Sequence, residues 1–263
     1  MIRVIYGVLT VVLAALLFGA CGSNDSGTNP APSGPNYYPN GNGTSYKYTI
    51  QTTDSNGTNV TGTRSSIYQG AQSFSGVSYQ VEFDSTTISG FPTTNKFYFR
   101  KTDAGVYFFA DTTGLSASVP DTLLQYVKLD SNEFGLFSFP FTDGKTWTVF
   151  KLSIVFGVIT IPVVDVSGAY AGKEDVVLNL AGGTATKNAV KVKFTLTLTI
   201  PNPDNVFQTY TKTYDAFAWL VDGIGIVRWQ GNAAILNTFS GSGIDLGDTT
   251  RVVSQSLVNY NIK

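Results

Sequence analysis

The residue types that most often carry out covalent catalysis are nearly missing from this sequence. Its 263 residues include no histidine and a single cysteine, Cys21. Ser-His-Asp and Cys-His systems activate their nucleophile through an imidazole base, and the usual zinc sites take histidine or cysteine ligands. The sequence therefore excludes these sites and leaves carboxylates, lysine, tyrosine and serine as candidates. It indicates no metal and no cofactor.

The carboxylates do not form a recognisable acid–base pair. Glycoside hydrolysis needs two carboxyl groups about 5 to 10 Å apart in a cleft. Most acids here are aspartates in turn-like positions, and the glutamates are Glu82, Glu133 and Glu174. Glu82 and Asp84 are two residues apart in an alternating stretch, so we expect both on one solvated strand face. We therefore expect a protein that is not an enzyme and assign no catalytic residue.

Two short motifs begin like ligand-binding loops but do not fit them. DSNGTN (residues 54–59) starts like a calcium loop, yet Gly57 is misplaced and no glutamate follows at the required distance. GIGIV (residues 223–227) lacks the third glycine and the helix of a dinucleotide loop. We expect a hairpin turn at the first motif, and a bulge or a close backbone approach at the second.

Cys21 ends a segment with the layout of a secretory signal peptide. Arg3 supplies a positive start, residues 8–18 are almost entirely apolar, and Gly19 and Ala20 are small. A membrane-spanning helix needs about 20 apolar residues, and this run is shorter. We expect residues 1–20 to be removed, so that Lys and Arg fall from 17 to 16 against 18 Asp and Glu.

The stretch LFGAC (residues 17–21) resembles the lipobox of bacterial lipoproteins. The resemblance implies cleavage before Cys21, a diacylglyceryl thioether on its sulfur and an acyl group on its new amino end, and so a membrane partner. Two or more chains make such an anchor stable, at about 0.8 kcal/mol per buried methylene. Gly22 and Ser23 lack the aspartate of an inner-membrane retention signal, which favours the outer membrane. The protein could face either the periplasm or the cell surface. The alternative is a soluble exported protein with a cysteine at the cut site.

A linker and one large domain are expected to follow. Residues 22–43 are mainly Gly, Ser, Asn and Pro, a composition that cannot repay the entropy of ordering. We expect the acylated cysteine and a flexible linker over residues 21–44, with Tyr37 and Tyr38 as candidates for docking, and a domain over residues 45–263.

The domain shows the two-residue period of strands. VKVKFTLTLTI (residues 190–200) alternates most regularly, and its length suits a barrel or a strongly curved sheet. Turn signals recur along the chain at residues 54–57, 103–105, 143–144, 182–183 and 222–223. We predict an all-β fold: a large antiparallel curved sheet, half-barrel or barrel, with at most one or two short helices. One helix is expected from a cap at Ser118 through DTLLQYV (residues 121–127).

Two segments are apolar on both strand faces, residues 152–164 and 217–229. Such strands need cover on both sides, or one face lines an apolar cavity. The corresponding hypothesis is a concave lining that binds a hydrophobic ligand. The residues expected to share this lining are Phe194, Leu196, Leu198, Trp219 and Ile226.

Three landmarks together resemble a group of uncharacterised bacterial envelope β-proteins. They are NYYPNGNGTSYKYTI (residues 36–50), FPFTDGKTWTV (residues 139–149) and AGGTATKNAVKV (residues 181–192), followed by a long strand and FAWLVDGIGIVRW. The resemblance implies a curved sheet or half-barrel, distantly like periplasmic lipoprotein carriers, and carries over no catalytic residue.

These observations favour a lipid-anchored, non-catalytic envelope protein that binds a hydrophobic envelope ligand on the concave face of its sheet. The alternative is a structural or adhesive surface lipoprotein that binds macromolecules through its loops. Nucleic acid is not an expected partner, because a net charge of −1 provides no strong positive field.

Overall fold

One antiparallel sheet of thirteen strands makes up most of the computed structural model, which describes residues 34–53, 56–110, 126–202, 205–240 and 250–263. The strands and the helix are β1 (Ser45–Thr53), β2 (Asn59–Phe74), β3 (Val77–Ile88), β4 (Phe91–Thr102), β5 (Gly105–Phe109), β6 (Val127–Leu129), β7 (Glu133–Ser138), β8 (Thr146–Phe156), β9 (Ile159–Leu180), β10 (Gly183–Asn202), β11 (Asn205–Val221), β12 (Gly225–Asn232), α4 (Ala233–Ser240) and β13 (Val252–Asn261).

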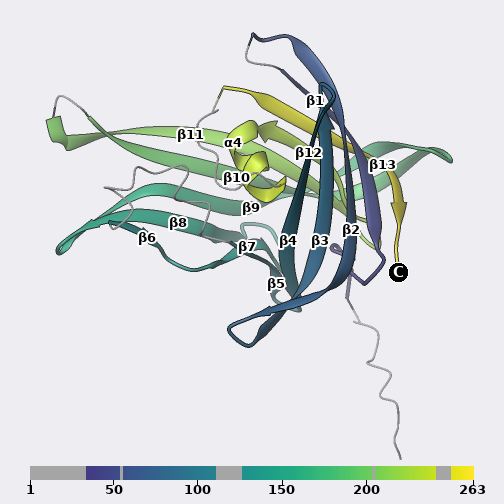
Figure 1. Cartoon of the computed structure of the whole chain (residues 1–263), viewed down its shortest axis with the longest axis horizontal. Coiled ribbons are helices and arrows are strands. Elements are labelled where there is room, and N and C mark those ends of the chain that lie inside the picture. Colours follow the sequence, from purple (N-terminus) through teal and green to yellow (C-terminus); the bar gives the residue numbers. More distant parts are fainter. Residues whose placement is uncertain (1–33, 54–55, 111–125, 203–204, 241–249) are drawn as a thin grey trace, which may run out of the picture. The chain divides into compact units, whose positions relative to one another are not determined.

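The strand order is β6-β8-β9-β10-β11-β12-β13-β1-β2-β3-β4-β5-β7, and every neighbouring pair is antiparallel. In Figure 1 the blue strands β2–β4 run steeply across the view and the teal to green strands β8–β11 run almost horizontally, so the sheet bends strongly between these two groups. The sheet is curved but not closed, since β6 and β7 end it. The predicted all-β class and curved antiparallel sheet are confirmed.

Alternation sorts the side chains of β10 into an inner and an outer face. The inner face, which carries α4, receives Val192, Phe194 and Leu196, all almost fully buried. The outer face receives Lys191 and Lys193. The nitrogens of these lysines lie 3.1 and 2.9 Å from carboxylate oxygens of Glu174 and Asp215 on the neighbouring strands.

Helix α4 fills the concave inner face. The side chain of Asn232 caps it by accepting a hydrogen bond from the backbone N–H of Ala234 at 3.0 Å. Its Phe239 packs against Phe194 and Trp229, with ring centroids 5.3 and 6.2 Å apart. Figure 1 shows α4 beside β10 and β12. The sequence pattern did not predict a helix at residues 233–240. Most of the helix expected from Ser118 falls on residues up to 125, which lie outside the described residues. Its last expected residue, Val127, begins β6 instead.

Several turns lie where the sequence placed them. Gly57, Gly144 and Gly223 have φ angles of 79°, 75° and 73°, in the left-handed region that glycine adopts at little cost. The segment 152–164 is not one strand, because a turn at Gly157 splits it into the ends of β8 and β9.

Residues Asn36–Lys263 form one unit with a continuous core. Tyr38 belongs to that core and Tyr37 packs against it, as expected for docking. Cys21 and residues 1–20 lie outside the described residues. Within the described residues, no helix has the length and apolar character needed to cross a membrane.

Candidate functional site

The concave face on which ligand binding was expected is filled by packed side chains. Phe194 and Leu196 have at most 1% of their surface exposed. The ring of Phe194 lies 6.0 Å from that of Phe137 and 5.7 Å from that of Trp229. Leu198 is half-buried against the same core. The structure therefore brings Phe194, Leu196 and Leu198 onto one face, where they serve as core.

Trp219 does not join them, because it lies on the outer face of β11. It pairs with Lys191 across the sheet, whereas Phe194 pairs with the inner residue Ala216. The indole N–H of Trp219 donates to Glu174, and Lys191 and Arg228 lie 5.1 and 4.8 Å from a Trp219 ring centroid. The fifth expected residue, Ile226, is half-buried, and its carbonyl accepts a hydrogen bond from the hydroxyl of Tyr48 at 2.9 Å.

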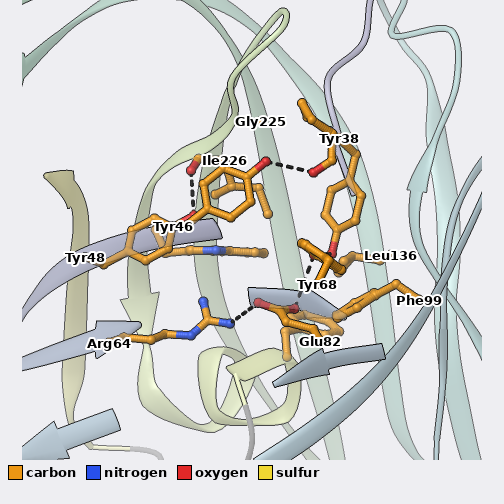
Figure 2. A pocket seen from close by; sticks show the side chains of 13 residues that line it. Tyr38, Tyr46, Tyr48, Arg64, Tyr68, Glu82, Phe99, Leu136, Gly225 and Ile226 are labelled. Atoms are coloured by element: carbon orange, nitrogen blue, oxygen red, sulfur yellow. Dashed lines mark hydrogen bonds and ion pairs between the residues drawn. The ribbon is translucent and has the colours of Figure 1, made fainter. Parts of the chain in front are cut away.

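A cavity of about 30 Å³ remains in this interior. Figure 2 shows its lining, which includes Tyr38, Tyr46, Tyr48 and Ile226. We call it the interior cavity. A volume of this size holds a water molecule, and it lies far below the roughly 300–1,000 Å³ of small-molecule sites. The interior cavity is therefore too small for a lipid.

Three charged side chains lie buried beside the interior cavity. Arg64 on β2 lies 3.1 Å from Glu82 and also forms an ion pair with Asp84, both on β3 (Figure 2 shows the first pair). We call these three residues the Arg64 cluster. Their side chains are 7%, 5% and 0% exposed. The expectation that Glu82 and Asp84 lie on a solvated face is wrong: the polar residues of β3 point inward here, and Phe83 points outward.

Tyrosines extend the Arg64 cluster. The hydroxyl of Tyr68 lies 3.2 Å from Glu82 Oε2 and 2.7 Å from the hydroxyl of Tyr38. The hydroxyl of Tyr46 donates to the carbonyl of Pro39 at 2.7 Å. Burial raises the pKa of the Glu82 carboxyl, and the charge of Arg64 partly offsets this. Because these groups satisfy one another in an interior that admits little more than water, we assign them a structural role.

A larger hollow lies on the outer face of the same strands. It has a volume of about 550 Å³ and spans β1, β2, β3 and β4. We call it the outer groove. Cross-strand pairing places its outward side chains in two rows. The first row is Ser45, Ile67, Phe83 and Lys96, and the second is Lys47, Ser65, Ser85 and Thr94.

The composition of the two rows accounts for the hollow and its chemistry. Ile67 and Phe83 are 40% and 36% exposed and form an apolar centre. The small side chains of Ser65 and Ser85 leave space beside it. Lys96 lies at one end, with its nitrogen 5.1 Å from the ring centroid of Phe83. An apolar centre with a few polar groups at its margins is typical of small-molecule sites.

Sequence reasoning missed the outer groove because it assigned Phe83 to the buried face of β3. The pairing of Ile67 with Phe83 brings two apolar residues together on a mainly polar face, and this pairing could not be read from either strand alone. Among the described residues, no three Asp, Glu or Cys side chains gather where they could hold a metal ion.

Comparisons with known proteins give matches to solved structures. No protein-family model matches the chain, and no curated protein matches it significantly. The chain is similar to a predicted lipoprotein from Parabacteroides distasonis, with 13% identity, 86% of this chain and 99% of that chain covered, and a TM-score of 0.43. It is similar to a predicted exported protein with a YmcC-like fold from Bacteroides fragilis, with 14% identity, 87% and 100% covered, and a TM-score of 0.44. It is also similar to the hypothetical lipoprotein YmcC from Escherichia coli, with 12% identity, 81% and 84% covered, and a TM-score of 0.32.

Proposed function

We propose that the chain is a non-catalytic cell-envelope protein, anchored to the outer membrane through an acylated Cys21, that holds a hydrophobic ligand in the outer groove. The location rests on the signal-peptide layout and the LFGAC stretch of the sequence. The binding role rests on one observation, the 550 Å³ groove centred on exposed Ile67 and Phe83. The ligand would lie on the outer face of the sheet, opposite the filled concave face.

The ligand is expected to be small, since the groove volume lies within the range of about 300–1,000 Å³ typical of ligand sites. Covering about 50 Å² of the Phe83 ring at about 25 cal/mol per Å² is worth about 1.2 kcal/mol, or close to eightfold in affinity. A ligand held in this way gains affinity from apolar contact and needs no reacting group.

The test starts with a chain that begins at Gly22 and so lacks the acylated Cys21, exported to a bacterial periplasm and purified without detergent. Native mass spectrometry is expected to show an added mass that organic solvent extracts. After extraction, a neutral fluorescent naphthylamine probe should bind to the wild type and several-fold more weakly to Phe83→Ser and Ile67→Ser. Val177→Ser is the matched control, because Val177 is 61% exposed but lies on β9, outside the groove.

Equal probe binding by the wild type, Phe83→Ser and the control would refute the groove as the binding site. Circular dichroism of each variant shows whether the sheet is intact, so that loss of binding is not confused with unfolding.

A second function is favoured by apolar residues at two hairpin ends. Phe91, after the β3–β4 turn, is 77% exposed, and Val158, in the β8–β9 turn, is 101% exposed. Exposed apolar loop ends suit an adhesive protein that meets macromolecules through its loops. In that case Phe91→Ser and Val158→Ser, and not Phe83→Ser, would reduce retention of the protein on isolated cell envelopes.

A further inference from the structure

The geometry of the outer groove points to a ligand with an acidic head group: we propose that it selects anionic, single-chain amphiphiles. Lys47 and Lys96 would bind the head group, and Ile67 and Phe83 would contact the hydrocarbon. This inference rests on the proposed function, because it names the class of ligand for the same groove.

In the part of the chain that the structure describes, Lys47 and Lys96 have no carboxylate partner, in contrast to three lysines on strands β8 and β10. Lys151, Lys191 and Lys193 each lie within 3.1 Å of an acidic side chain on a neighbouring strand. Among the described residues, neither Lys47 nor Lys96 takes part in an ion pair. Their positive charges are therefore available to an anion from outside.

Their cross-strand neighbours explain why these charges are not neutralised. Lys47 pairs with Ser65 on one side and Asn259 on the other. Lys96 pairs with Phe83. The acidic residue of the groove lining, Asp84, directs its carboxylate inward to the ion pair with Arg64.

The charge of the groove contrasts with that of the whole chain. The chain has a net charge of −1, so its surface has no general attraction for anions. Two exposed lysines beside an apolar centre form a local positive site. A ligand that is both apolar and anionic satisfies the two features together, whereas a purely polar anion would leave Ile67 and Phe83 uncovered.

The layout favours one hydrocarbon chain. Lys47 on β1 and Lys96 on β4 lie at diagonally opposite ends of the two rows. These two strands are three strand spacings of about 4.8 Å apart, so the distance between them is about 14 Å. The apolar floor between them consists of Ile67 and Phe83, and hydroxyl side chains flank it. Because a lysine is a point charge on a flexible stem, either ammonium group can reach a head group above this floor.

The test compares probes that share one alkyl chain and differ in head group. Dodecyl phosphate and dodecanoate are the anionic probes, and dodecyl maltoside is the neutral probe, each below its micelle concentration. The protein is the delipidated chain from Gly22, which retains the whole unit Asn36–Lys263. Binding is measured by displacement of the neutral naphthylamine probe in low salt and in about 0.5 M salt.

We expect the wild type to bind the anionic probes about tenfold more tightly than the neutral probe, and high salt to reduce the preference. Lys47→Gln and Lys96→Gln should each reduce anion affinity by about two- to fivefold, as expected for exposed charge pairs. The double variant should bind all three probes alike. Lys187→Gln, at an exposed position of β10, is the control and should behave as the wild type.

Neutral and anionic probes of equal affinity in the wild type would overturn this inference and leave the proposed function standing. A preference retained in the double variant would overturn it in the same way. If none of the probes binds, the proposed function fails and the inference fails with it. Binding to anionic lipid vesicles without binding of the monomeric probes would also overturn it, in favour of a membrane surface as the occupant.

Discussion

Replacing Arg64 by methionine removes the positive charge that two buried carboxylates share. Methionine keeps much of the length of the side chain, so the change isolates the guanidinium. Removing one partner of a buried ion pair typically costs about 3–5 kcal/mol, because the other partner is left charged and unpaired. Here Glu82 and Asp84 both lose their counterion, and their side chains are 5% and 0% exposed. We therefore expect a loss at the upper end, about 5 kcal/mol of unfolding free energy at pH 7.

The loss should shrink as the pH falls, because a protonated carboxyl needs no counterion. Burial already raises the pKa of the Glu82 carboxyl, so protonation of Glu82 at the lower pH recovers a measurable part of the lost stability. The assay is urea unfolding at pH 7 and pH 4.5, followed by tryptophan fluorescence and far-UV circular dichroism. The triple variant Arg64→Met, Glu82→Gln, Asp84→Asn should regain most of the stability.

Lys151→Met provides the matched control. It breaks the ion pair between Lys151 and Asp165. Because these side chains are 39% and 35% exposed, the change should cost about 1 kcal/mol of unfolding free energy or less. A loss below about 1 kcal/mol for Arg64→Met, or the same loss at both pH values, would refute the reasoning that the Arg64 cluster is a buried and mutually neutralising group.

Three further changes test the pH response, the core and one close approach. Burial raises the pKa of the Glu82 carboxyl above its ordinary value of 4.5. The stabilising contribution of protonated Glu82 is therefore complete below pH 4.5 and is lost as the pH rises through the raised pKa. Thermal melts should therefore show the wild type losing stability relative to Glu82→Gln between pH 4.5 and 7, and a constant difference would contradict this. Phe194→Ala, at a fully buried position, should cost about 3–5 kcal/mol in urea unfolding; a loss under 1 kcal/mol would mean that the concave face is not packed. Gly168→Ala would place a Cβ 2.3 Å from the Trp147 ring and should cost about 1–3 kcal/mol, whereas Gly182→Ala, with no atom within 4 Å of its Cβ, should have little effect on the melting temperature.

Strand content could be predicted because alternation is a local property. The segment 190–200 alternates in the sequence and lies within β10, whose inner and outer faces carry apolar and polar residues as expected. The turns also followed from local chemistry, since Asp-Gly and similar pairs favour positive φ. Helix α4 was missed because its eight residues are too few for a clear helical period, and its stability depends on packing against the concave face.

The Arg64 cluster could not be predicted because its members come from two strands. On β3 the apolar residues Tyr79, Val81 and Phe83 alternate with polar ones, and the local pattern points to the apolar face as the buried one. Pairing with β2 brings Arg64 to the other face, where its charge makes burial of Glu82 and Asp84 possible. The outer groove was missed for the same reason, because its apolar centre forms only when β2 and β3 are in register.

The position of β13 has a consequence for the order of events during synthesis of the chain. In the described sheet, the backbone ladder that connects β1–β5 with β8–β12 passes through β13. Its neighbour β1 lies early in the chain, and the adjoining contact between Lys263 and Thr44 spans 219 positions. In a polypeptide that emerges amino end first, the backbone ladder between the two groups of strands is therefore completed only after β13 has emerged. Because folding slows when contacts are distant in sequence, this arrangement delays completion of the sheet until synthesis of the chain is almost finished.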